Sequence, residues 1–190
     1  MSILSKHRQL RGRPVVALGV ALFVALNGAQ AWGATQGSLG ATSQGSIAIS
    51  ASVPSRARIT GLTDVSFANQ DPSTAASSAQ NVCVWSNTAT NGYTITATGS
   101  GTSSAFTLTN GAGIVPYSVE WAATSGQTSG SALVAGTASS SLTSGAVNQT
   151  CSSAPLASAS LIVKMSTTDL STMIAGSSYT GTLTLLVTPQ

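Results

Sequence analysis

Strict alternation of apolar and small side chains is the feature that most limits what this chain can fold into. In residues 44–53, four apolar side chains alternate with serine and alanine: Ile47, Ile49, Ala51 and Val53. A period of two residues places these four side chains on one face of a β-strand. Taken alone, the pattern favours an ordinary first strand of a β-sandwich. Because Pro54 ends the run, the alternative is a strand that leaves its own domain and completes a neighbouring subunit.

The chain begins with the pattern that is typical of a secretory signal peptide. Basic residues precede an apolar run at residues 15–26, and Ala29 and Ala31 supply small side chains at the cleavage positions. The run is shorter than the roughly 20 apolar residues that span a bilayer, which argues against membrane insertion. We therefore predict a signal peptide at residues 1–31, an N-terminal extension with the leading strand at 32–54, a folded domain at 55–190, and export of the protein.

Removal of the signal peptide changes the charge of the chain. The mature chain keeps three basic residues, Arg56, Arg58 and Lys164, against four acidic ones, Asp64, Asp71, Glu120 and Asp169. No basic surface then remains to attract phosphates, so we expect no nucleic acid as a partner.

The remaining composition is typical of an all-β domain. Serine, threonine, alanine and glycine dominate, valine, isoleucine and leucine are spaced among them, and strong helix formers are rare. Clear alternation recurs at residues 93–98, 114–122, 159–165 and 179–187. About seven or eight short strands with turn signals between them predict an immunoglobulin-like sandwich.

Local signals also predict particular connections. Residues 81–86 and 93–98 flank a turn that ends in Asn91-Gly92, which predicts a β-hairpin. Val65-Ser66-Phe67 predicts a further short strand, and residues 69–79, rich in Asp, Pro, Ser and Ala, predict a loop.

Cys83 and Cys151 are the only cysteines. In a chain that passes through an oxidising compartment we expect them to form a disulfide bond. They lack the CxxC spacing of a redox motif, and without histidine in the mature chain we expect no metal ion and no cofactor.

The residues needed for catalysis are scarce. The only histidine, His7, precedes the predicted cleavage site, so the mature chain has no Ser-His-Asp or Cys-His site. Its acids are scattered along the sequence, and a glycosidase would need two of them brought together by the fold. We therefore expect a protein that is not an enzyme.

Five runs of sequence resemble the spore coat protein U domain proteins, the pilin subunits of archaic (Csu-type) chaperone–usher pili. These runs span residues 82–87 (VCVWSN), 91–100 (NGYTITATGS), 106–111 (FTLTNG), 116–121 (PYSVEW) and 178–190 (SYTGTLTLLVTPQ). The resemblance extends over essentially the whole mature chain. Where many members of the family carry a cysteine soon after the first strand, this chain has Ser55-Arg-Ala-Arg58.

The resemblance implies an incomplete immunoglobulin-like sandwich whose open groove accepts a donor strand. A periplasmic chaperone would fill the groove first, and the N-terminal strand of a neighbouring pilin would replace it at an outer-membrane usher. The donor side chains would be Ile47, Ile49, Ala51 and Val53, and the groove residues that contact the chaperone would be Leu183, Leu185 and Val187. The implied product is a fimbrium on the cell surface that serves adhesion and biofilm formation. The chain fits a stalk or adaptor subunit better than a tip adhesin, which would need a second domain.

A secreted, monomeric β-sandwich that binds carbohydrate or forms a coat is the alternative from another class. Trp85, Tyr93, Tyr117 and Trp121 would then line a sugar site, although aromatic residues on strand faces more often belong to the core. The position of residues 46–53, either in the domain's own sheet or outside it, separates the two hypotheses.

Overall fold

The computed structural model describes residues 33–190, and the predicted signal peptide lies outside the described residues. The described residues belong to two units, which meet in the sequence between Ala51 and Ser52. Within the described part of the chain, no helix is long and apolar enough to cross a membrane.

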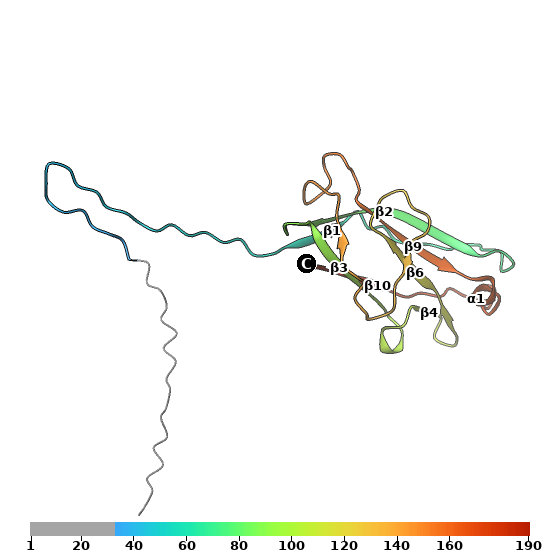
Figure 1. The fold of residues 1–190 in the computed structure, drawn as a ribbon. Coiled ribbons are helices and arrows are strands. Elements are labelled where there is room, and N and C mark those ends of the chain that lie inside the picture. The colour runs from blue at the N-terminus through green and yellow to red at the C-terminus, as the bar shows by residue number, and fades with distance from the viewer. Residues whose placement is uncertain (1–32) are drawn as a thin grey trace, which may run out of the picture. The chain divides into compact units, whose positions relative to one another are not determined.

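The larger unit consists of antiparallel β-sheets, which confirms the all-β prediction (Figure 1). One sheet has five strands in the order β1 (Ala57–Thr60), β2 (Ala76–Ser86), β9 (Ala159–Met165), β6 (Ser118–Ala122) and β7 (Ser131–Ala132). The second has three in the order β10 (Leu183–Pro189), β3 (Gly92–Gly99) and β8 (Leu142–Thr143), and a third pairs β4 (Thr107–Thr109) with β5 (Ile114–Pro116). Two short helices, η1 (Thr102–Ser104) and α1 (Thr167–Ser171), complete the unit.

One apolar core joins the two larger sheets. It combines Val82 and Val84 of β2 and Leu161 of β9 with Tyr93 and Ile95 of β3, and all five side chains are buried. Packing of this kind is the main source of stability in a small β-domain. The core therefore holds the two sheets against each other.

A buried hydrogen bond also connects these sheets. Trp121 of β6 donates from Nε1 to the Tyr93 hydroxyl of β3, over 3.1 Å. Burial raises the pKa of Tyr93, with the Trp121 bond acting in the opposite direction. Each aromatic ring thus supplies apolar area to the core while its polar atom has a partner.

The alternating pattern correctly predicted which side chains face the core. In residues 114–122, the four side chains assigned to one face are all buried: Val115, Tyr117, Val119 and Trp121. The strand itself breaks at Tyr117, so that β5 and β6 belong to different sheets. The boundaries of β9 match the predicted strand at 159–165.

The predicted hairpin between residues 81–86 and 93–98 is wrong. β2 pairs with β1 and β9, whereas β3 pairs with β10 and β8. The turn does occur, with Asn91 at a positive φ of 51° and the Gly92 N–H bonded to the Thr88 hydroxyl at 2.8 Å. The turn carries the chain from one sheet to the other. β2 and β3 then pack their apolar faces against each other across the core, and such packing needs no hydrogen bonds between the two strands.

Three predicted boundaries also differ from the structure. Residues 65–67 form no strand, and β2 begins at Ala76, inside the predicted loop. Pairing with β9, which sets Ala76 opposite Met165, overrides the weak strand propensity of this Ser/Ala-rich segment. The last strand begins at Leu183, since the preceding segment bonds instead to β4 through Thr180 and Thr109.

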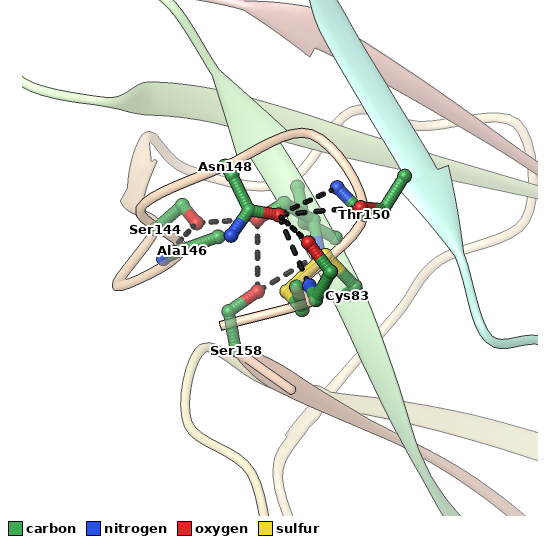
Figure 2. The surroundings of a disulfide bond; sticks show 9 residues. Cys83, Ser144, Ala146, Asn148, Thr150 and Ser158 are labelled. Atoms are coloured by element: carbon green, nitrogen blue, oxygen red, sulfur yellow. Dashed lines mark hydrogen bonds between the residues drawn. A yellow bond between two sulfur atoms is a disulfide. The ribbon is translucent and has the colours of Figure 1, made fainter. Parts of the chain in front are cut away.

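The predicted disulfide between Cys83 and Cys151 is present, with the two Cα atoms 5.9 Å apart. Both cysteines are buried beside Ala146, and the half-buried Trp85 packs on them. The bond fastens residues 144–158 to β2, as Figure 2 shows.

Side chains around the disulfide supply hydrogen bonds that strand pairing does not. The Ser158 hydroxyl accepts from the Val84 N–H and donates to the Val84 carbonyl, each over 2.8 Å, and Ser144 also donates to that carbonyl (Figure 2). The amide oxygen of Asn148 accepts from the backbone N–H groups of Thr150 and Ser152, each at 3.1 Å. The loop is thus held in place without a regular strand.

We expect replacement of both cysteines by serine to lower the free energy of unfolding by about 4 kcal/mol, because the bond closes a 68-residue separation in the unfolded chain. Urea unfolding of the variant and the unreduced parent measures the difference. Alkylation before reduction should label neither cysteine. Equal unfolding midpoints, or free thiols in the parent, would contradict the prediction.

Tyr93→Phe should lower the free energy of unfolding by about 1–3 kcal/mol, since it leaves the buried Trp121 Nε1–H without a partner. Tyr117→Phe is the matched control, because the Tyr117 hydroxyl forms no hydrogen bond within residues 33–190 and its loss should have little effect. Thermal unfolding of both variants provides the comparison. Equal losses in both would show that the bond to Trp121 contributes nothing particular.

Candidate functional site

An apolar cleft of about 1210 Å³ opens in the larger unit. One wall is the irregular segment 62–70, and the other is the segment from Met173 to the first half of β10. Its floor is made of core side chains: Leu108, Tyr117, Leu161, Val163, Met165 and Leu170. The cleft is therefore a part of the core that no strand covers.

Exposed apolar side chains stand at the rim of this cleft. Leu62 on one wall is 47% exposed and Ile174 on the other is 58% exposed. Asp64 is the only charged residue among the lining residues of the described chain, and its position on the wall leaves the floor uncharged. Such a surface suits an apolar occupant.

The strand at one side of the cleft has a free edge. β10 is the last strand of its sheet and pairs only with β3; β1 lies close to it but pairs with β2 alone. Within the described residues, the outer edge of β10 has no strand partner. A free edge of this kind is a template for the addition of another strand.

The alternation of hydrogen-bonded and non-bonded residue pairs between β10 and β3 shows which residues of β10 have backbone groups that point to the free edge. Gln190 donates to the Gly92 carbonyl at 3.0 Å, and in an antiparallel ladder bonded and non-bonded pairs alternate. The carbonyls of Ile95 and Ala97 on β3 accept from Ser139 and Gly136 on the far side, which fixes the same phase.

It follows that the N–H and C=O groups of three residues point away from β3: Leu183, Leu185 and Val187. Their side chains are half-buried and pack against the core. Leu183 and Leu185 line the cleft, whereas Val187 lies farther along the strand and is not among the lining residues. Two of the three predicted groove residues thus combine a free backbone edge with a position in the cleft.

The predicted donor residues lie outside every β-strand. Ile47 is 73%, Ile49 86% and Val53 79% exposed, and Ala51 is exposed as well. Within its own unit the segment begins at a single antiparallel bridge, where Thr35 and Ser46 exchange backbone bonds of 2.8 and 2.9 Å. From residue 47 to residue 53 the backbone makes no hydrogen bond to another segment of the described chain.

Three of the four acids in the described residues accept hydrogen bonds within the domain. Two Lys164 bonds of 2.7 Å and the Gly130 N–H lower the pKa of Glu120, and backbone and hydroxyl bonds from Ser73 lower the pKa of Asp71. Asp169 forms a capping box with Ser166 at the start of α1. Within residues 33–190 no three acidic, histidine or cysteine side chains gather as metal ligands.

The aromatic residues considered for a sugar site lie mainly in the core. Tyr93 and Trp121 are buried and bonded to each other, and Tyr117 stacks on Phe106 with ring centroids 5.7 Å apart. Trp85 packs beside the disulfide. They do not form one exposed aromatic surface.

Sequence reasoning missed most of the cleft. The alternation at residues 159–165 predicts one buried face, and that face does belong to the core. The second role of its side chains as the cleft floor depends on the absence of a strand above them. The wall at 62–70 was assigned in part to a strand. The sequence signal there, two apolar residues at Val65 and Phe67, predicts a strand and does not reveal a wall without strand partners.

Comparison of the chain with models of known protein families and with curated protein sequences found no match.

Proposed function

We propose that the protein is a structural subunit of a cell-surface fimbrium, a pilin of the archaic chaperone–usher type in a stalk or adaptor position. The observation that carries this proposal is the free edge of β10 beside the apolar cleft. In this proposal the domain is an immunoglobulin-like sandwich that lacks one strand. A strand from another molecule completes it.

The proposed assembly uses two occupants in succession. After export to the periplasm, a pilus chaperone adds a strand at the free edge and covers the cleft. At the outer-membrane usher, residues 47–53 of a neighbouring subunit replace the chaperone. Repetition of this step builds a fibre that serves adhesion and biofilm formation.

Physical chemistry supports residues 47–53 as the donor. Each isoleucine that passes from water into an apolar site contributes about 1.5–3 kcal/mol, and Ile47 and Ile49 are both largely exposed. The main-chain ladder with β10 would supply direction, while alternate side chains that enter the cleft would supply register. The segment carries no charge, so its insertion leaves no ion buried.

Leu185→Asp should abolish complexes with the chaperone, because an unpaired carboxylate would lie in the apolar cleft beside the free edge. Leu186→Asp is the matched control. Leu186 is 60% exposed on the opposite face of the same strand, and its variant should still bind. Co-purification from the periplasm with the chaperone measures both. Normal recovery of the Leu185→Asp complex would place the chaperone site elsewhere.

Ile49→Asp should stop fibre formation while chaperone binding persists, because the change affects the donor segment and leaves the cleft intact. Ser50→Asp places the same charge on the other face of the segment and should assemble better than Ile49→Asp. Electron microscopy of fibres and chaperone co-purification are compared for each variant. Loss of both activities in Ile49→Asp would show that the segment belongs to its own domain, as in a monomeric sandwich.

A further inference from the structure

Gln80 is a polar residue in an apolar series. On β2 it shares a face with Val82 and Val84, both fully buried in the core. Gln80 itself is half-buried and lines the cleft. Because an amide in such a place is unfavourable unless it is hydrogen-bonded, its partners indicate what it does.

Both ends of the Gln80 amide bind the backbone of Thr63. Oε1 accepts from the Thr63 N–H at 2.7 Å and from its hydroxyl at 3.1 Å. Nε2 donates to the Thr63 carbonyl at 3.0 Å. The side chain thus makes the two main-chain bonds that a neighbouring strand would otherwise supply.

Thr63 stands at the start of the cleft wall formed by residues 62–70. Within the described chain, every hydrogen bond from residues 61–75 to the rest of the domain goes to Gln80. The other bonds of this segment are local, from Ser73 and Thr74 to Asp71 and from Gln70 to Ala68. The Gln80 side chain therefore provides the hydrogen bonds that hold the wall against the domain.

We propose that Gln80 is a positioning residue that sets the width of the cleft, so that the cleft admits a single added strand. The inference rests on the proposed function. Strand addition requires a certain spacing between the wall at 62–70 and β10, and Gln80 is the side chain that maintains it. Without the amide, the wall is held by the packing of Val65 and Phe67 against the core, which has no preferred direction. Those side chains are then free to move over the floor.

Gln80→Leu separates this role from a contribution to stability. Leucine continues the apolar series of Val82 and Val84, so the variant should keep or raise the unfolding temperature of the parent. The probe is a synthetic peptide of residues 44–53. Its affinity for Gln80→Leu should be about tenfold lower than for the parent, because the hydrogen bonds between residue 80 and Thr63 are lost. Both proteins carry Ile49→Asp, so that their own donor segments do not compete.

Amide hydrogen exchange supplies a readout that needs no peptide. The Thr63 N–H, which is the hydrogen-bonded backbone amide of the wall, should exchange about tenfold faster in Gln80→Leu, whereas exchange in β9 should not change. Gln127→Leu is the matched control, because the side-chain amide of Gln127 bonds, among the described residues, only to the Ser125 carbonyl and lies outside the cleft. It should leave both peptide binding and wall exchange as in the parent.

Gln80→Glu adds a test by pH. A carboxylate can accept from the Thr63 N–H but cannot donate to its carbonyl, whereas a protonated carboxyl does both. Peptide binding by this variant, relative to the parent at the same pH, should be weak at pH 7 and recover below about pH 4.

Two failures can be told apart. If the parent binds the peptide and Gln80→Leu binds it equally tightly, or if wall exchange is unchanged, the role of Gln80 is wrong and the proposed function stands. If the parent itself does not bind the peptide, the proposed function fails and the inference fails with it.

Discussion

The structure depends on the packing of β9, which has strand partners on both sides and presents Leu161, Val163 and Met165 to the core. The same three side chains form much of the floor of the cleft. Polar residues at these three positions would remove the apolar floor of the cleft, but they would also remove the centre of the core. An exposed apolar cleft is thus inseparable from this fold for as long as no strand lies beside β10.

Hydroxyl and amide side chains take the place of strand partners at several positions. Ser158 bonds both backbone groups of Val84, the Ser139 hydroxyl accepts from the Ile95 N–H, and Gln80 binds Thr63 on both sides. Each of these positions lies where a regular ladder ends. A composition rich in serine and threonine and poor in charge therefore matches a domain with short strands, because buried backbone groups still need partners.

Periodicity in the sequence predicts the face of a residue and leaves its strand partner undetermined. Alternation predicts that Val115, Val119 and Trp121 share one face, and that face is buried, although their strand divides between two sheets. The turn at Asn91 was also correct, yet the hairpin was wrong, since the pairing of β2 with β9 joins residues far apart in sequence. Alternation at the C-terminal end predicts the inward face of Leu185, and the resemblance adds its place in a groove. The wall at 62–70 could not be predicted, because its hydrogen bonds to the domain come from a single side chain of β2.

The chain exposes apolar side chains in two places. One is the cleft with its free edge, and the other is the segment of Ile47, Ile49 and Val53, whose backbone after Ser46 has no strand partner in the described residues. A monomer that left both in water would forgo the burial of several large side chains and would keep an edge prone to non-specific pairing. In the proposed assembly, exchange of segments between copies would cover both surfaces at once, and each copy that accepts a strand would still have one to donate. Because the proposed contact joins two different surfaces, its repetition would build an open fibre wherever the rotation between successive copies does not close a ring.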